Sequence, residues 1–165
     1  MSMKLTNIVE IKAKLVLQTG LHIGAGDSEM HIGGIDNSVI KHPMTQSPYI
    51  PGSSLKGKIR TLLEWRSGAV QSAPLSLKDI SKNPEEVKNI LRLFGISGDT
   101  KNSEQEVAEI GVSRLAFWDC ALNEAWENEI RDDNQLLTEA KSENTIDRIT
   151  STEGNPRQTE RVPAG

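Results

Sequence analysis

The chain has 165 residues, which is enough for one domain with a sizeable core. Its formal net charge of -4 argues against a protein that grips nucleic acid by overall basicity, although a local basic strip could still contact phosphates. No long apolar segment follows the N-terminus, so the sequence argues against a secretory signal and a membrane partner and favours a cytoplasmic location.

The first predicted element is a strand over residues 9–17. Its apolar residues alternate with charged and polar ones, which is the period of a strand with one buried face. These apolar residues are Val9, Ile11, Ala13, Leu15 and Leu17. The next segment, residues 20–34, contains five glycines and is predicted to be a functional loop, because glycine leaves the backbone flexible.

A first helix is predicted after Pro51, with Ser53 or Ser54 as its N-terminal cap. Apolar residues recur there at helical spacing until Arg66 interrupts the pattern, so the helix is expected to end near that residue. The predicted buried stripe consists of Leu55, Ile59, Leu62 and Leu63.

A second helix is predicted after a polar, proline-containing stretch. Asn83 is its expected cap, Pro84 its first residue and Gly95 the residue just past its end. Its predicted apolar stripe consists of Val87, Ile90, Leu91 and Phe94.

The last third of the chain is predicted to contain a strand, a short helix and a hairpin. Residues 112–120 alternate like a strand, and Trp126 lies in a weakly amphipathic helical turn. One face of the strand consists of Ser113, Leu115, Phe117 and Asp119. Residues 134–161 are polar and are predicted to form a projecting hairpin with its turn near Gly154.

The candidate metal ligands and nucleophiles do not form a familiar pattern. The spacings of His22, His31 and His42 match no zinc site, and we expect them to be loop residues. Cys120 has no partner for an internal disulfide and is expected to be a small buried hydrophobe.

The first helix offers the clearest candidate for phosphate contacts. Lys56, Lys58 and Arg60 flank its apolar stripe and could hold an RNA backbone, although such residues are more often a solvated face. The free N–H groups at its start, near Ser53 and Ser54, could bind an anion, or they could simply be capped by the serine side chains.

Several segments of the chain, taken together, carry a specific pattern. They are residues 19–24 (Thr-Gly-Leu-His-Ile-Gly), 32–36 (Ile-Gly-Gly-Ile-Asp), 50–60 (beginning Ile-Pro-Gly-Ser-Ser-Leu-Lys), 93–95, 143–148 and 155–161. This series closely resembles the RAMP superfamily, and most closely the backbone subunit of type III-A CRISPR effector complexes. It covers nearly the whole chain in the same order.

The resemblance implies a fold and an assembly. The expected fold is α+β, a ferredoxin-like or RRM-type core with long insertions, in a single domain over residues 1–165. Residues 20–50 would hold a glycine-rich catalytic loop, and residues 134–161 would be a thumb-like insertion that interrupts the guide–target duplex. The family pattern continues into further core strands, so the domain is expected to be incomplete at its C-terminus.

The resemblance also implies site residues and partners. Asp36 would be the cleavage residue and would hold Mg²⁺ or another divalent cation, whereas a lone loop aspartate is otherwise most often a turn former. The implied RNA contacts are His22, Ser53, Ser54, Lys56, Lys58, Arg60, Arg148, Arg157 and Arg161. The implied partners are guide RNA, target RNA, further copies of the chain in a filament and other subunits of the effector complex.

Two alternatives remain open from the sequence. The chain could be a structural guide-binding subunit without cleavage activity, which a cleavage assay would separate. It could also be a small-molecule phosphate-binding enzyme that uses the loop of residues 24–34, although no catalytic base or nucleophile pair accompanies that loop.

Overall fold

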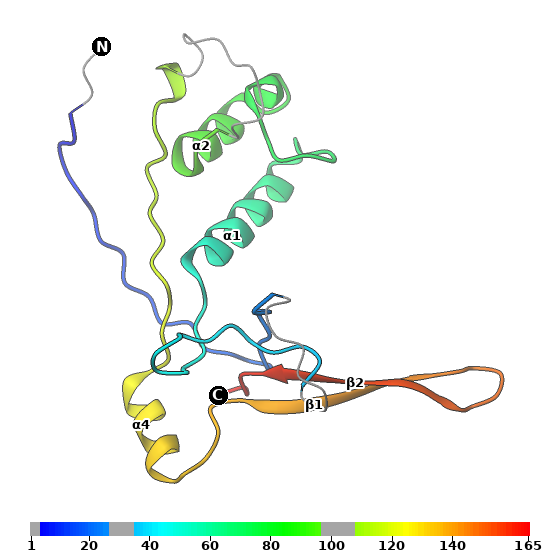
Figure 1. Cartoon of the computed structure of the whole chain (residues 1–165). Helices are drawn as coiled ribbons and strands as arrows, with labels where there is room; N and C mark the ends of the chain where they lie inside the picture. The colour runs from blue at the N-terminus through cyan, green and yellow to red at the C-terminus, as the bar shows by residue number, and fades with distance from the viewer. Residues whose placement is uncertain (1–3, 27–34, 97–107) are drawn as a thin grey trace. The chain divides into compact units, whose positions relative to one another are not determined.

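The computed structural model of the protein describes residues 4–26, 35–96 and 108–165. The chain divides into two compact units, which we call the hairpin unit (Met1–Pro48 with Asn123–Gly165) and the helical unit (Tyr49–Leu122). Both helices and an antiparallel strand pair are present (Figure 1), so the expected α+β class is confirmed. Within the described residues, no helix is long and apolar enough to cross a membrane.

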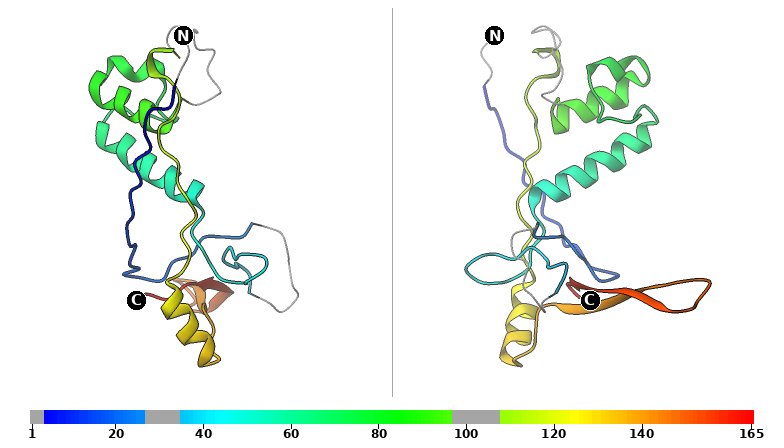
Figure 2. Two further views of the ribbon diagram at one scale, coloured as in Figure 1. Left: turned by 90° about the vertical axis from the view of Figure 1, so that its left-hand side faces the viewer. Right: turned by 45° about the vertical axis from the view of Figure 1, so that its right-hand side comes forward.

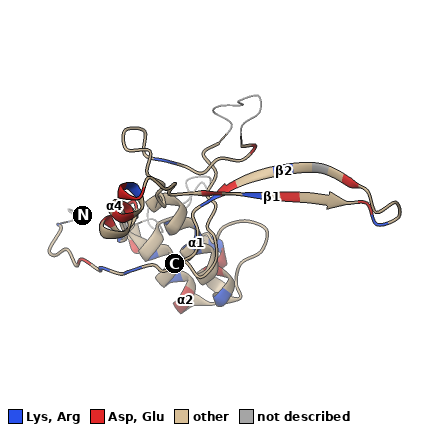
Figure 3. Cartoon of the chain, turned by 90° about the horizontal axis from the view of Figure 1, so that it is seen from below, with Lys and Arg blue, Asp and Glu red and all other residues tan. Residues whose placement is uncertain are grey.

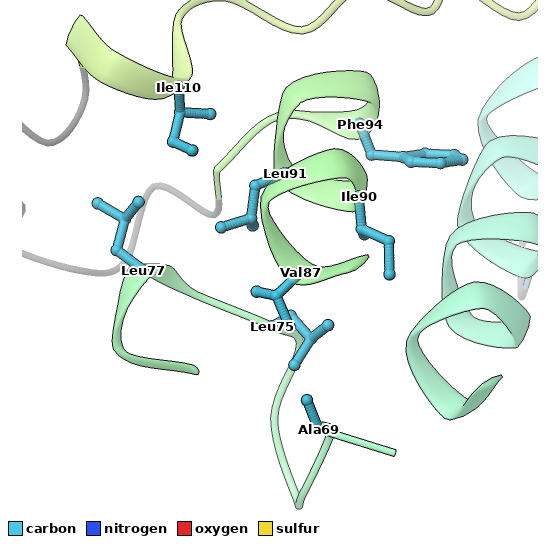
Figure 4. Close-up of a cluster of buried hydrophobic side chains, with 8 residues drawn as sticks. All are labelled: Ala69, Leu75, Leu77, Val87, Ile90, Leu91, Phe94 and Ile110. Carbon is cyan, nitrogen blue, oxygen red and sulfur yellow. The ribbon is translucent and has the colours of Figure 1, made fainter. Parts of the chain in front are cut away.

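The core of the helical unit lies between α2 (Pro84–Phe94), the short 3-10 helix η1 (Leu77–Ser81) and the segments around them (Figure 4). Its buried members are Ala69, Leu75, Leu77, Val87, Ile90, Leu91, Phe94 and Ile110. The stretch between the two predicted helices therefore supplies core residues, although its polar composition predicted only a connection. Leu75 is fully buried there.

The prediction for the second helix is confirmed in its bounds and its buried face. Asn83 is the N-cap, Pro84 begins α2 and Gly95 is the C-cap. Gly95 has a φ of 92°, in the left-handed region that favours glycine, which explains why the helix ends there. All four residues of the predicted stripe are buried.

The first helix, α1 (Gly52–Ser67), begins differently from the prediction. Pro51 is its N-cap and no side chain caps it, so capping by Ser53 or Ser54 is wrong. The N–H of Gly52 is instead satisfied by Asp119 Oδ1 at 2.7 Å. A Cβ at Gly52 would lie 2.4 Å from the carbonyl oxygen of Phe117, so the helix start requires glycine.

The predicted apolar stripe of α1 is only partly correct. Ile59 and Leu63 pack against the core, but Leu62 is 48% exposed while Glu64 is only 4% exposed. Glu64 faces inward because its carboxylate pairs with Arg60 at 2.8 Å and accepts the backbone N–H of Leu75 at 3.1 Å. The prediction that Leu62 belongs to the buried stripe is therefore wrong, and Glu64 is buried on α1 as part of a polar network.

The predicted strands over residues 9–17 and 112–120 are wrong as strands, since both segments lack regular structure apart from a single bridge between Cys120 and Ile50. A strand needs a neighbour that is hydrogen-bonded along its length. The described residues make only isolated backbone hydrogen bonds to these two segments, such as the N–H of Gly165 to the carbonyl of Leu17. The alternation over residues 112–120 still governs burial. Leu115 and Phe117 pack against the core, while Trp118 is 78% exposed.

The predicted hairpin is confirmed. In the hairpin unit, β1 (Glu139–Ile146) pairs antiparallel with β2 (Glu153–Arg161) (Figure 2). The turn does not lie near Gly154, which pairs with Thr145 inside the ladder. It covers residues 147–152, where Asp147 Oδ1 accepts two backbone N–H groups at 2.8 Å. These bonds lower the pKa of Asp147, and they make an aspartate rather than a glycine the turn former.

The predicted helical turn around Trp126 is α4 (Glu124–Asp132), capped by Asn123, whose side chain accepts the N–H of Trp126. α4 is joined to the loop before Pro48 by polar contacts. Arg131 donates to the carbonyl of Thr45 at 2.9 Å, and Glu127 accepts from the Ser47 hydroxyl.

Candidate functional site

Asp36 lies along the outer edge of β2. Its Oδ2 accepts the backbone N–H of Gln158 at 2.8 Å. Asn37 donates its N–H to the carbonyl of Gln158 at 3.2 Å and accepts the N–H of Glu160 at 2.9 Å. Residues 36–37 therefore extend the strand pair by a short parallel segment, which fixes the predicted cleavage residue on the hairpin.

The register of β2 explains why this edge is available. In an antiparallel ladder alternate residues direct their N–H groups to opposite sides. Gln158 and Glu160 donate to residues 36–37, while Pro156, on the same side, has no N–H. The bonded edge therefore begins at Gln158.

Glu160 is the centre of a buried polar network at the base of the hairpin. It is only 4% exposed. Its Oε1 accepts from Lys41 Nζ and Thr138 Oγ1, each at 2.5 Å, and its Oε2 accepts the N–H of Val39 at 3.0 Å. Burial by itself would raise the pKa of Glu160, but these hydrogen bonds and the lysine charge outweigh it and lower that pKa. The carboxylate therefore holds three segments of the chain together.

His22 is held on the same strand. Its Nδ1 lies 2.6 Å from the carbonyl oxygen of Glu160, and the neighbouring Leu21 forms a bridge with Val162. Because a carbonyl oxygen only accepts, Nδ1 carries the proton of this hydrogen bond. His22 and Asp36 are thus anchored to backbone groups two residues apart on β2, or about 7 Å along a strand.

A surface hollow of about 570 Å³ lies beside the carboxylate and is lined by Asp36, Asn37, Pro156 and Arg157. The structure therefore brings two of the predicted site residues, Asp36 and Arg157, to one place. The exposed guanidinium of Arg157 could meet a phosphate there.

The other two predicted arginines of the hairpin differ in their surroundings. Arg148 is exposed in the turn, and Figure 3 shows charges of both signs along the strand pair. Arg161 pairs with Glu139 at 2.6 Å. Its side chain also passes so close to Gly20 that a Cβ there would lie 2.5 Å from Arg161 Cδ. The Arg161 side chain is therefore engaged in contacts within the protein, and its RNA contact stays a prediction.

The basic residues of α1 belong to the helical unit and are not equivalent. Lys58 is exposed, with Nζ 5.9 Å from the centre of the Trp65 ring. Lys56 Nζ reaches Ser113 Oγ at 3.3 Å. Arg60 bonds Glu64 and the carbonyl oxygens of Gly95 and Leu75. These contacts favour a structural role for Arg60, while its RNA contact stays a prediction, as it does for Lys56 and Lys58 and for the exposed Ser53 and Ser54.

A site built by the protein alone for a metal ion is not present in the described ranges, because no three His, Cys, Asp or Glu side chains gather there. Mg²⁺ usually binds through one or two carboxylates together with substrate phosphates, and Asp36 is the carboxylate that would hold it here. Asp36 Oδ1 accepts no hydrogen bond from the residues that the structure describes, so one carboxylate oxygen fits such an ion. His31 and the loop of residues 27–34 lie outside those residues.

Sequence reasoning missed the residues that hold the site. Glu160, Asn37 and Gln158 were part of matched or neighbouring segments, but no local pattern gave them a role. A glutamate within a polar hairpin is normally exposed. Glu160 is buried because residues 37–41, which are distant in sequence, lie against it and bond its carboxylate.

Comparison with known proteins now places the chain in a family. A model of the RAMP superfamily matches residues 14–165. The chain belongs to the RAMP superfamily. The family suggested by the sequence motifs is therefore confirmed, over nearly the whole length of the chain.

Several curated RAMP relatives bear the name CRISPR system Cms endoribonuclease Csm3. The protein of Streptococcus thermophilus is 44% identical over 155 residues, 93% of this chain and 62% of the relative. That of Enterococcus italicus is 40% identical over 157 residues, 95% of this chain and 66% of the relative. That of Mycobacterium tuberculosis is 40% identical over 158 residues, which are 95% of this chain and 59% of the relative. The chain thus spans about three fifths to two thirds of these relatives.

A solved structure shares the RAMP chain's fold. It is a chain from a cryo-EM structure of the type III-B Cmr-beta complex bound to cognate target RNA, with a TM-score of 0.51 and 11% identity. The match covers 90% of this chain and 78% of the other. At this identity the likeness concerns the fold, which agrees with the α+β architecture expected from the sequence.

Proposed function

We propose that this chain acts as a Csm3-type backbone subunit of a type III-A CRISPR effector complex, which binds guide RNA and cuts the paired target RNA. The similarity to relatives named endoribonuclease Csm3 supports the assignment to this class. The observation that carries the choice of residue is the seat of Asp36 on β2, with one carboxylate oxygen bonded and a hollow beside it.

The proposed reaction is attack by a ribose 2′-OH on its neighbouring phosphate. The 2′-oxygen forms a bond to phosphorus as its proton is removed, the bond from phosphorus to the 5′-oxygen breaks, and a water molecule protonates the departing 5′-oxygen. Asp36 accepts that proton through Oδ1 or holds a divalent cation there. Mg²⁺ or another divalent cation would supply neutralisation of the charge that develops on the phosphate. Arg157 lines the same hollow and orients the phosphate.

The proposed partners follow from this function. Guide RNA, target RNA, further copies of the chain in a filament and the other effector subunits would assemble in the cytoplasm. Lys58, with Ser53 and Ser54 at the exposed start of α1, offers phosphate contacts. Such contacts give affinity without reading sequence, since pairing with the guide provides the specificity.

The test uses the effector complex assembled with this chain, a guide and a complementary target RNA. We expect metal-dependent cuts at regular intervals, and the loss of those cuts when Asp36 is replaced by alanine while the target stays bound. A complex that binds target and never cuts it would favour the structural guide-binding subunit. A complex that binds no RNA at low salt would refute both.

A further inference from the structure

We infer that β2 of the thumb-like hairpin is the positioning element for Asp36, and that the backbone N–H of Gln158 is the group that aims the carboxylate. This inference rests on the proposed function, because it concerns the same reaction. It adds that cutting depends on the register of the hairpin, which is the part expected to meet the guide–target duplex.

The N–H groups of β2 point to both of its edges. Gln158 pairs with Ser142 across the ladder, but its N–H is donated to Asp36 Oδ2 at 2.8 Å, on the opposite edge. The same edge bonds Asn37 through Gln158 C=O and Glu160 N–H. Three hydrogen bonds therefore fix the backbone and the side chain of residues 36–37 relative to two residues of β2.

A buried hydrogen-bond network around Glu160 locks this register. Glu160 is buried and its carboxylate bonds Val39 N–H and Lys41 Nζ, both just after the Asp36 segment, as well as Thr138 Oγ1 just before β1. A slip of β2 by two residues would move these groups by about 7 Å. The buried carboxylate would then lose all three partners, so the network permits one register.

The rest of the hairpin is accessible to RNA. Every residue of β1 is exposed, and the ladder has an irregularity between Glu143 and Thr145, beyond the locked base. A nucleic acid held against the exposed strands would therefore act on the same strand that orients Asp36. A displacement of a catalytic group by about 1 Å can lower the reaction rate on the order of a hundredfold.

The matched variants are Gln158→Pro and Gln158→Ala. Proline removes the N–H bonded to Asp36 and keeps the ladder with β1, because proline is tolerated where a strand N–H faces away from its partner. Alanine keeps the N–H and removes only the side chain. We expect the proline variant to lose about a hundredfold in the single-turnover cleavage rate, with target affinity and cut positions unchanged. The alanine variant should stay within about twofold of the parent.

A second measurement does not depend on cleavage. Asparagine at position 36 keeps an oxygen acceptor, whereas alanine does not. Hydrogen exchange at the Gln158 amide should therefore accelerate in the complex with Asp36→Ala and stay close to the parent with Asp36→Asn. This measurement decides the matter if Gln158→Pro prevents assembly.

The outcomes separate this inference from the proposed function. Equal cleavage by the proline and alanine variants, or equal exchange at Gln158 in all three position-36 forms, would overturn the positioning role. Loss of target binding together with cleavage in the proline variant would also overturn it, since the strand would then serve the duplex and not Asp36. If Asp36→Ala cuts normally, the proposed function itself fails.

Discussion

Replacing Glu160 by alanine should loosen the base of the hairpin and with it the Asp36 segment. The carboxylate accepts three hydrogen bonds while only 4% of the residue is exposed. Without it, the N–H of Val39, itself 4% exposed, has no acceptor. The Lys41 side chain is 30% exposed and can regain water. We therefore place the loss near the lower end for breaking a buried pair, about 3 kcal/mol.

Hydrogen exchange measures this loss directly as local opening. Amides of Asn37 and Glu160 should exchange on the order of a hundredfold faster in Glu160→Ala, which is the equivalent of about 3 kcal/mol. Glu143→Ala is the matched control, because Glu143 lies in the same ladder and its pair with Lys141 is exposed. It should leave those amides unchanged. Equal exchange in the two variants would refute the lock.

Because the pKa of Glu160 is lowered in the folded protein, its contribution to stability depends on pH. A carboxylate whose folded pKa lies below its ordinary value of 4.5 stabilises the fold fully above that value. This contribution is lost as the pH falls from about 4.5 through the lower folded pKa. Acidification in that window should therefore speed exchange in the parent and have a smaller effect in Glu160→Ala.

Three further predictions concern the helical unit. Lys58→Ala should weaken RNA binding by the complex whatever the RNA sequence, and should reduce the slope of log binding constant against log salt concentration by about 0.7. An unchanged slope would mean that Lys58 touches no phosphate. Arg60→Ala should lower the free energy of unfolding by about 2–4 kcal/mol in urea titrations, because Glu64 and two backbone carbonyls lose their donor. A loss below about 1 kcal/mol would leave Arg60 available for RNA. Gly52→Ala should also lower the urea midpoint, because its Cβ would meet the Phe117 carbonyl at 2.4 Å, whereas Gly57→Ala, which has open space, should not.

Local signals in the sequence predicted α2 well. The helix has its stop signal, its first-turn proline and its buried stripe within a single run of residues, and the same run packs against the core. The hairpin was also visible from its polar strands. The sequence pattern predicts its turn near Gly154, but Asp147 supplies the hydrogen bonds that close the turn.

Features that depend on distant partners could not be predicted from local pattern. Residues 9–17 alternate like a strand, but pairing requires a neighbour that no local signal identifies. Leu62 is exposed on α1, against the prediction, while Glu64 is buried because Arg60 and the N–H of Leu75 bond its carboxylate. The motif around Asp36 resembles a family signature in the sequence. The hydrogen bond from Gln158 to Asp36 depends on the position of β2, which the sequence does not give.

The most direct test of the account is single-turnover cleavage of a complementary target RNA by the complex assembled with Asp36→Ala, with target binding measured on the same preparation. The account predicts unchanged binding and a fall in cleavage on the order of a hundred- to ten-thousand-fold. Cutting at the parental rate by a complex that carries only the alanine variant would contradict it.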